Sequence, residues 1–345
     1  MALRIKRLDL SFRTAYAQAK EIALVQSEVP LLTPGTLQTE NRGNSRFVYR
    51  YRYDANGKRV AEYIGPEGTQ DTVARLAAID EEIRGGLALS EASRALRKIG
   101  FYSADNSTVV TVARLFNAGI FRGGAVLVGS HAFGALLSEL GVSVPFPMTE
   151  DVDIARAGRI KIAALPRPGF LGLLRETGLP FQEVPELRRG APPTSFKVRG
   201  KALKVDLLVP AKGEPYRSVK VPELNAHATG LPFLEFLLED PVQSLLLGRD
   251  RIVPILVPAA GRYCIHKLAV YALRSGSDNP KRDKDAFQAA TLAAVLAGEQ
   301  DFLLHAAIEA MNKALRAKAR AGARRALQWL GDDYPEAASV LQSLA

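Results

Sequence analysis

Three apolar segments in the middle of the chain meet polar residues at fixed positions, and this arrangement limits the fold more than any other feature. The first segment, residues 125–128, ends at Gly129-Ser130, and an apolar-rich stretch follows immediately. The second is DVDIA, residues 151–155, and the third is LKVDLLV, residues 203–209. We interpret these segments as strands of one small sheet, with a helix starting directly after the first strand.

Carboxylates are placed on two of these strands. Asp151 and Asp153 lie two residues apart, so they face the same side of a strand, where they repel each other unless a cation lies between them. Asp206 has apolar strand neighbours, and its burial without a partner would be costly. Three carboxylates suffice for two Mg²⁺ ions about 3.5–4 Å apart that clamp the attacking and leaving oxygens of a phosphoryl displacement. The pattern therefore predicts a site for two Mg²⁺ ions at Asp151, Asp153 and Asp206, with Mn²⁺ as the alternative ion.

The junction at Gly129-Ser130 fits the same chemistry. A helix that begins there presents unpaired N–H groups and the positive end of its dipole, which together bind phosphate. Glycine lets the backbone approach a triphosphate, and the Ser130 hydroxyl adds a donor. The alternatives are a simple turn for Gly-Ser and a solvated loop for Asp-x-Asp; the order of the three segments favours the site.

Composition restricts the class of protein. The chain has 345 residues, a formal net charge of +10 and a sequence pI of about 9.7, which favours RNA, DNA or nucleotide phosphates as partners. The alternative is a scattered surface charge, and net charge alone does not separate the two. No apolar run approaches the length of a membrane span, and the N-terminal residues lack a signal-peptide cleavage site, so we expect a cytoplasmic protein with no membrane partner. The single cysteine, Cys264, is expected in the core.

The chain is expected to be an α+β protein in three parts: an N-terminal domain of helices and a β-hairpin (1–104), a catalytic core with a small mixed sheet flanked by helices (105–257), and a C-terminal helical domain (258–345). In the first part we expect a helix over 8–28, a loop over 34–45, a hairpin with its tight turn at Asn56-Gly57, and two helices, from about 69 and over 90–99. In the last part we expect helices over 259–274, 283–297 and 301–330.

Two basic stretches allow two interpretations each. Tyr49, Tyr51 and Tyr53 alternate with arginines in the hairpin, so they could stack on single-stranded nucleic acid, or they could pack on a helix while the arginines face water. We expect the second arrangement. The basic segment 313–325 could track an RNA backbone or form a solvated helix face, and we expect the solvated face.

The segments LVGSHAF, TEDVDIA and LKVDLLV resemble the core of the DNA polymerase beta-like nucleotidyltransferase superfamily. The later stretch HKLAVYALRSGSDNPKRDKDAFQAATL is similar to the helical region of bacterial nucleotidyltransferase-fold proteins, including the nucleotidyltransferase toxins of type IV toxin–antitoxin and abortive-infection systems. The hairpin sequence at 63–66 resembles the N-terminal part of one branch of these proteins. Twenty residues separate Ser130 from Asp151, more than in compact versions of the motif.

The resemblance implies a magnesium-dependent transfer of a nucleoside monophosphate from an NTP to a hydroxyl acceptor, with an RNA or tRNA 3′ end as one acceptor and an antitoxin as one partner. A protein or small-molecule hydroxyl is another acceptor, and a non-catalytic binding protein on a decayed scaffold is the alternative function. By the same resemblance Asp151 and Asp153 bind both metals, and Asp206 binds the catalytic metal. The residues implied in nucleotide binding are Gly129, Ser130, Lys267, Lys281, Lys284 and Asp285.

Two histidines lie close to these positions. His131 follows Ser130, and it could contact phosphate or base or be a polar surface residue of the first helical turn. His266 begins an apolar helix beside Lys267, and we expect it to be structural. No set of histidines and cysteines has the spacing of a zinc site.

Overall fold

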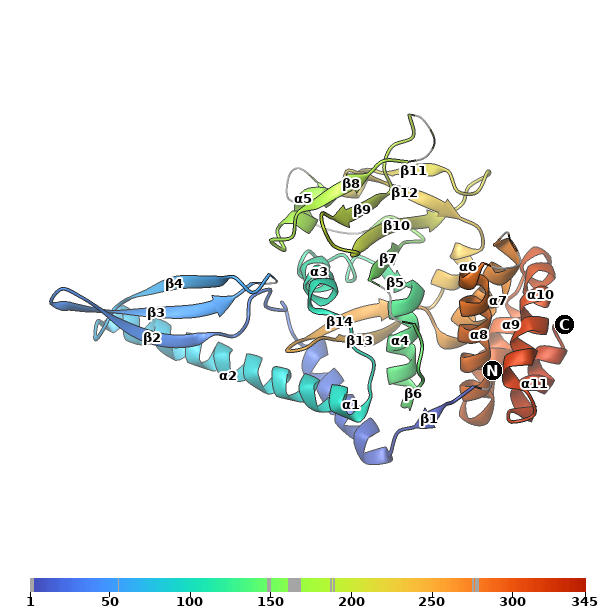
Figure 1. Cartoon of the computed structure of the whole chain (residues 1–345), viewed down its shortest axis with the longest axis horizontal. Coiled ribbons are helices and arrows are strands. Elements are labelled where there is room, and N and C mark those ends of the chain that lie inside the picture. Colours follow the sequence, from blue (N-terminus) through green and yellow to red (C-terminus); the bar gives the residue numbers. More distant parts are fainter. Residues whose placement is uncertain are drawn as a thin grey trace.

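A computed structural model describes residues 3–54, 56–147, 150–160, 169–186, 188, 190–274, 276 and 279–345 (Figure 1). Helices and strands are mixed along the chain, and a mixed sheet in its middle is flanked by helices, which confirms the predicted α+β class. The helices of the C-terminal third pack together beside this sheet (Figure 1).

The central sheet contains the three predicted segments. Its strands run in the order β11-β12-β10-β7-β5, with β9 beside the first half of β10 and β8 beside β9. β10 pairs parallel with β7 and β12, whereas β5 and β9 run antiparallel to their neighbours. The strands of the central sheet are β5 (Val126–Val128), β7 (Asp151–Ala155), β8 (Phe181–Val184), β9 (Ser195–Val198), β10 (Lys204–Pro210), β11 (Ser218–Val221) and β12 (Ala226–Leu231).

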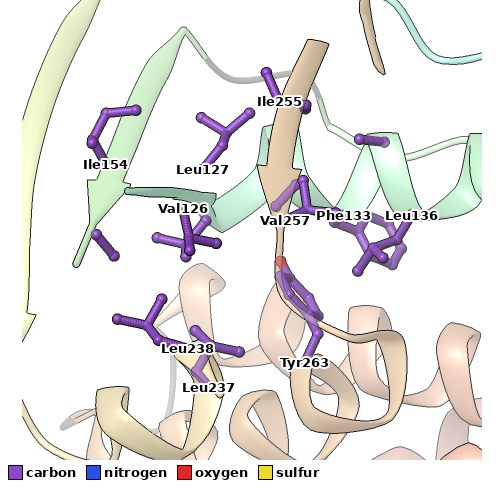
Figure 2. Close-up of a cluster of buried hydrophobic side chains, with 14 of the residues drawn as sticks. Val126, Leu127, Phe133, Leu136, Ile154, Leu237, Leu238, Ile255, Val257 and Tyr263 are labelled. Atoms are coloured by element: carbon purple, nitrogen blue, oxygen red, sulfur yellow. The ribbon is translucent and has the colours of Figure 1, made fainter. Parts of the chain in front are cut away.

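The two faces of the central sheet differ in burial. In β10, Val205, Leu207 and Val209 are buried, and the residues between them are half-buried. Leu127 and Ile154 are likewise buried, and they point to the opposite side of the sheet from Val126 (Figure 2). In β10 this period of two leaves the alternate positions for polar groups, whereas in β5 Val126 and Val128 are buried as well, so both faces of that strand lie in the core.

Helices cover the central sheet and its edge. α4 follows β5 without a loop, and Figure 2 shows Val126 pointing toward α6 in the core. The predicted helix over 301–330 is interrupted at 310–312, where Asn312 caps α10 by accepting from the Leu315 N–H at 2.8 Å. The helices of this part of the molecule are α3 (Asn106–Asn117), α4 (Gly129–Glu139), α5 (Phe170–Arg175), the 3-10 helix η1 (Pro222–Leu224), α6 (Leu234–Leu238), α7 (Ala260–Leu273), α8 (Pro280–Glu299), α9 (Asp301–Glu309), α10 (Lys313–Leu330) and α11 (Pro335–Gln342).

Two short pairings close the structure around these elements. β13 (Val242–Leu247) and β14 (Ile252–Val257) form an antiparallel hairpin, and β14 packs beside β5. β1 (Lys6–Arg7) pairs with β6 (Val142–Ser143), within the stretch that separates Ser130 from Asp151.

The N-terminal part forms an arm that extends away from the central sheet (Figure 1). It consists of an antiparallel sheet, the arm sheet, whose one face packs on a long helix. α1 packs against the end of this helix, and it is shorter than the predicted 8–28. The elements of this part are α1 (Leu10–Leu24), β2 (Thr36–Arg42), β3 (Ser45–Tyr53), β4 (Arg59–Pro66) and α2 (Gln70–Ile99).

Two predictions for the arm are wrong, and a third is confirmed. The expected loop over 34–45 contains strand β2, because its polar residues lie at an exposed sheet edge where no apolar pattern is needed. The expected tight turn is present: the Gly57 N–H donates to the Asp54 carbonyl and the Asp54 N–H to the Lys58 carbonyl, each at 3.0 Å, and Gly57 has φ +78°. The two expected helices are one helix, α2, that passes through Gly85-Gly86; a Cβ at Gly86 would lie 3.0 Å from Pro34 Cγ.

The orientation of the arm sheet also differs from the prediction. Arg50 is 2% exposed and faces α2, where its guanidinium donates to both Glu82 carboxylate oxygens at 2.9 and 3.1 Å. Its Nε donates to the Pro34 carbonyl at 2.9 Å. The tyrosines therefore lie on the face away from α2, because side chains alternate along β3 and the arginine positions are occupied by this fully bonded pair.

Two further observations concern polarity. Cys264 is fully buried, as predicted, and burial raises the pKa of its thiol to about 12. Within the described ranges, no helix combines the length and the apolar character needed to cross a membrane.

Candidate active site

The predicted carboxylates come from two neighbouring parallel strands. Asp206 of β10 lies opposite Asp153 of β7, and Lys204 lies opposite Asp151. Residues that are opposite in register project to the same side of a sheet, and so do residues two apart on one strand. Asp151, Asp153 and Asp206 therefore share one side of the central sheet, which we call the carboxylate face.

Gly129 brings the start of α4 against Asp153. Val128 is opposite Asp153 in the pairing of β5 with β7, so α4 begins beside this carboxylate. Gly129 has φ +68°, and a Cβ added to it would overlap Asp153 Oδ2. Only glycine fits this position, because both the left-handed backbone and the close carboxylate exclude a side chain. Ser130 follows at the first turn of α4 and is 7% exposed.

Lys204 is a member of this group that the sequence analysis missed. Its Nζ lies 2.7 Å from Asp206 Oδ2. Burial opposes the charged form of Lys204, but the hydrogen bond and the charge of Asp206 outweigh it and raise the pKa of the lysine. The signal was present in the sequence: Lys204 is two residues before Asp206 in a strand, so it had to face the same side.

Charge is concentrated and incompletely paired on the carboxylate face. Burial, followed by the repulsion from Asp206, raises the pKa of Asp153 to about 7. Asp206 Oδ1 is buried and has no hydrogen-bond partner. An unsatisfied carboxylate oxygen beside two further carboxylates is the donor chemistry that Mg²⁺ or Mn²⁺ prefers.

The fit to a metal depends on side-chain positions. Among the residues that the structure describes, no three His, Cys, Asp or Glu side chains are already grouped so that they could hold a metal. The ion pair of Lys204 with Asp206 occupies one of the oxygens concerned. The donor types and their shared face fit a divalent cation, and in the structure Lys204 supplies the positive charge next to Asp206 Oδ2.

A cationic network from α7 and α8 lies near these carboxylates. Lys267 Nζ is 2.7 Å from Asp285 Oδ1, and Arg274 Nε is 2.5 Å from Asp285 Oδ2. Burial favours the neutral form of Asp285, but the charges of Lys267 and Arg274 outweigh it and hold the pKa of this carboxyl below its usual range. Asp285 thus fixes the position of Lys267, whose charge also acts on Asp153.

Tyr263 links α7 to the turn at Gly129, a contact that the sequence analysis did not anticipate. Its hydroxyl lies 2.8 Å from the Gly129 carbonyl oxygen and 3.2 Å from Gln288 Oε1. Lys267 Nζ lies 5.3 Å from the centre of the Tyr263 ring, one helical turn along α7. The spacing of four residues between Tyr263 and Lys267 was the available signal.

The two remaining lysines differ in position. Lys284 is half-buried; burial and the charge of Lys267 lower its pKa, while Asp285, Asp153 and Asp151 oppose this shift. Because the charges of Asp153 and Asp151 act on Lys284, this lysine lies near the carboxylate face. Lys281 is exposed on the first turn of α8, three residues before Lys284 and on the same helix face.

His131 is buried in this cluster and not at the surface. Its Nδ1 lies 2.7 Å from the Tyr102 hydroxyl, and its Nε2 is buried without a hydrogen-bond partner. Burial lowers the pKa of His131 to about 4, so the ring is neutral near pH 7. His266 is also buried, as expected for a structural residue, and burial lowers its pKa to about 3.

A polar cavity of about 540 Å³ opens beside the carboxylate face. Thr229 of β12 lies opposite Leu208, two residues after Asp206, and Ser218 of β11 lies opposite Thr229. Both residues line the cavity and project to the same side as the carboxylates. One strand across and two residues along corresponds to roughly 8 Å between the Cα atoms of Asp206 and Thr229. Other residues that line it are Glu186, Arg188, Thr194 and Arg217.

Comparison with known proteins agrees with this geometry. A family model described as a nucleotidyltransferase matches residues 106–313, which is more than half of the chain and includes β5, β7, β10, α7 and α8. Neither a curated protein nor a solved structure matches the chain. The match covers every predicted site residue, and the chain therefore belongs to the nucleotidyltransferase family.

Proposed function

We propose that this nucleotidyltransferase is a magnesium-dependent enzyme that moves a nucleoside monophosphate from an NTP to a hydroxyl group and releases pyrophosphate. The observation that carries the proposal is the register of Asp153 opposite Asp206, beside the Gly129 turn. A strand pair with adjacent carboxylates next to a helix N-terminus binds the two parts of a metal–triphosphate complex.

The chain's own groups define the reaction. The acceptor oxygen forms a bond to the α-phosphorus, and the bond from that phosphorus to the pyrophosphate oxygen breaks. Asp206 Oδ1, which has no partner, accepts the proton of the acceptor hydroxyl. Divalent magnesium, or Mn²⁺, held by Asp151, Asp153 and Asp206, would neutralise the charge of the triphosphate.

The triphosphate is oriented by hydrogen-bond donors and by positively charged side chains. The N–H groups at the start of α4, including that of Ser130, face the anion. Lys267, held by Asp285, and Lys284 supply positive charge from the opposite side, and Lys281 extends it toward solvent. With the Tyr102 hydroxyl donating to its Nδ1, neutral His131 donates a hydrogen bond from Nε2 and adds no charge.

The acceptor in this proposal is RNA, and a tRNA 3′ end is its sharpest form. The net charge of +10 supports a polyanionic acceptor. The cavity of about 540 Å³ beside Asp206 contains two arginines and is large enough for a terminal nucleoside. A role as a toxin neutralised by an antitoxin belongs to the same proposal, and growth arrest on expression, absent in Asp206→Asn, would support it.

Labelled transfer tests the proposal. The protein is incubated with each α-³²P-labelled NTP, Mg²⁺ and total RNA, either untreated or oxidised with periodate to destroy the terminal diol. Label in untreated RNA only is the expected result. Label in the protein itself, or none in RNA, would remove the RNA acceptor, and the first of these results would indicate a protein hydroxyl instead.

A non-catalytic nucleic-acid-binding protein is the competing function. The ion pair between Lys204 and Asp206 favours it, because a resident ammonium ion can satisfy a carboxylate without a metal. RNA binding without turnover, unchanged by Asp151→Ala, would establish this function. Metal binding measured by calorimetry in wild type and lost in Asp206→Asn would argue against it.

A further inference from the structure

The outward face of the arm sheet carries a continuous row of aromatic rings. Ring centres are 6.0 Å apart for Phe47 and Tyr63, 5.4 Å for Tyr63 and Tyr49, and 6.2 Å for Tyr49 and Tyr51. Tyr63 is 49% exposed, Phe47 and Tyr49 are half-buried, and Tyr51 is 9% exposed, with the Arg59 guanidinium over its ring. Such a contiguous exposed aromatic patch is unusual on a protein surface and marks an interaction site.

The row is not part of a core. The other face of the arm sheet packs on α2 through Val48, Arg50 and Ile64, which are buried. Figure 1 shows α2 on one side of the arm sheet and, among the elements drawn, none covering the other side. The aromatic face therefore contributes little burial to the fold, and its residues are available to a partner.

Two arginines accompany the rings. The Arg42 guanidinium carbon lies 5.2 Å from the centre of the Tyr49 ring, and that of Arg59 lies 3.6 Å from the Tyr51 ring. Both arginines are exposed, and their guanidinium groups lie over neighbouring rings at the Tyr49–Tyr51 end of the row. Glu40 of the same face accepts from the Tyr51 hydroxyl.

We propose that this aromatic face binds single-stranded RNA. Unpaired bases stack on exposed rings, and flanking arginines contact the phosphates; this combination fits a single strand better than a duplex, whose bases are already stacked. An apolar protein partner would not need two guanidinium groups on the rings of the row. The tyrosine hydroxyls and the Gln38 amide, opposite Tyr49, offer partners for the ribose 2′-hydroxyl.

This surface is separate from the nucleotidyl-transfer site, so the inference goes beyond the proposed function. It would hold RNA along the arm whether or not that RNA is the acceptor. The test uses neither NTP nor Mg²⁺, and a protein without transferase activity could still give the expected result.

Fluorescence anisotropy with the full chain and a labelled 12-nucleotide single-stranded RNA measures the interaction. Tyr49→Ala/Tyr63→Ala should weaken binding by about tenfold or more, because stacking on each ring is lost. Tyr49→Phe/Tyr63→Phe should bind within about threefold of wild type, since the rings remain. Phe302→Ala is the matched control, because Phe302 is an exposed aromatic residue of α9, outside the arm.

The outcomes separate the alternatives. Equal binding by wild type and Tyr49→Ala/Tyr63→Ala overturns the proposal, as does equal affinity for duplex RNA. Equal affinity for single-stranded DNA overturns the assignment to RNA. Tyr63→Ala alone, at a half-exposed position, provides a second variant if the double variant has an altered circular dichroism spectrum or melting temperature.

Discussion

The central sheet and the arm sheet place charged side chains in opposite ways. In the arm, Arg50 lies on the buried face, and each part of its guanidinium has an acceptor in Glu82 or Pro34. In β7 and β10, the buried side chains of one face are apolar, and the charges of Asp153 and Asp206 lie together on the other face, with one Asp206 oxygen unpaired. A charge that is fully bonded stabilises the fold, whereas charges gathered without sufficient partners indicate a ligand.

The largest effect is expected from Asp206→Asn. The change removes a cation ligand and the proposed proton acceptor, so nucleotidyl transfer should fall on the order of 10³-fold. The melting temperature should be unchanged or higher, because repulsion with Asp153 is relieved. Asp240→Asn, at an exposed carboxylate, is the control and should retain activity. Full activity in Asp206→Asn would mean that Asp206, like Arg50, serves the fold and not the reaction.

A smaller effect, on stability and not on activity, is expected from Arg50→Ala. The change leaves a cavity and removes the guanidinium that donates to Glu82 and to the Pro34 carbonyl, so local opening of the arm should become about 3 kcal/mol easier. Hydrogen exchange of residues 45–66 should accelerate roughly 100-fold while nucleotide binding is retained.

Arg46→Ala is the matched control on the same strand. Arg46 forms an exposed ion pair with Glu67 at 2.9 Å, and such pairs contribute about 0–1 kcal/mol. Similar exchange rates in the two variants would mean that burial of Arg50 does not stabilise the arm.

The smallest effect concerns pH in the presence of a chelator. The pKa of Asp153 is about 7 in the folded protein and about 4 in an unfolded chain, so the folded protein binds more protons between these values. The stability contribution of Asp153 therefore decreases as pH rises from about 4 to about 7, and it is constant above. Asp153→Asn removes this contribution, and the difference in melting temperature between pH 5 and pH 8 should shrink by about 2 °C. A larger difference in melting temperature in the variant would contradict the prediction that Asp153 contributes less stability as pH rises.

Several features followed from the sequence alone because they depend on local rules. The alternation of Val205, Leu207 and Val209 fixed the buried face of β10, and the Gly129-Ser130 pair fixed the start of α4. The spacing of Asp151 and Asp153 placed both on one side of β7. These are consequences of strand periodicity and of backbone geometry at glycine.

The tertiary structure decided the rest. Whether Asp206 meets Asp153 depends on strand order and register, which long-range pairing sets and local pattern does not. The arm shows the same point: alternation in β3 separated tyrosines from arginines correctly, but only the packing of α2, with Glu82 in reach of Arg50, determined which set was buried. The sequence defines the two faces of a strand; the partner element selects one of them, because the free energy of burial depends on what lies opposite.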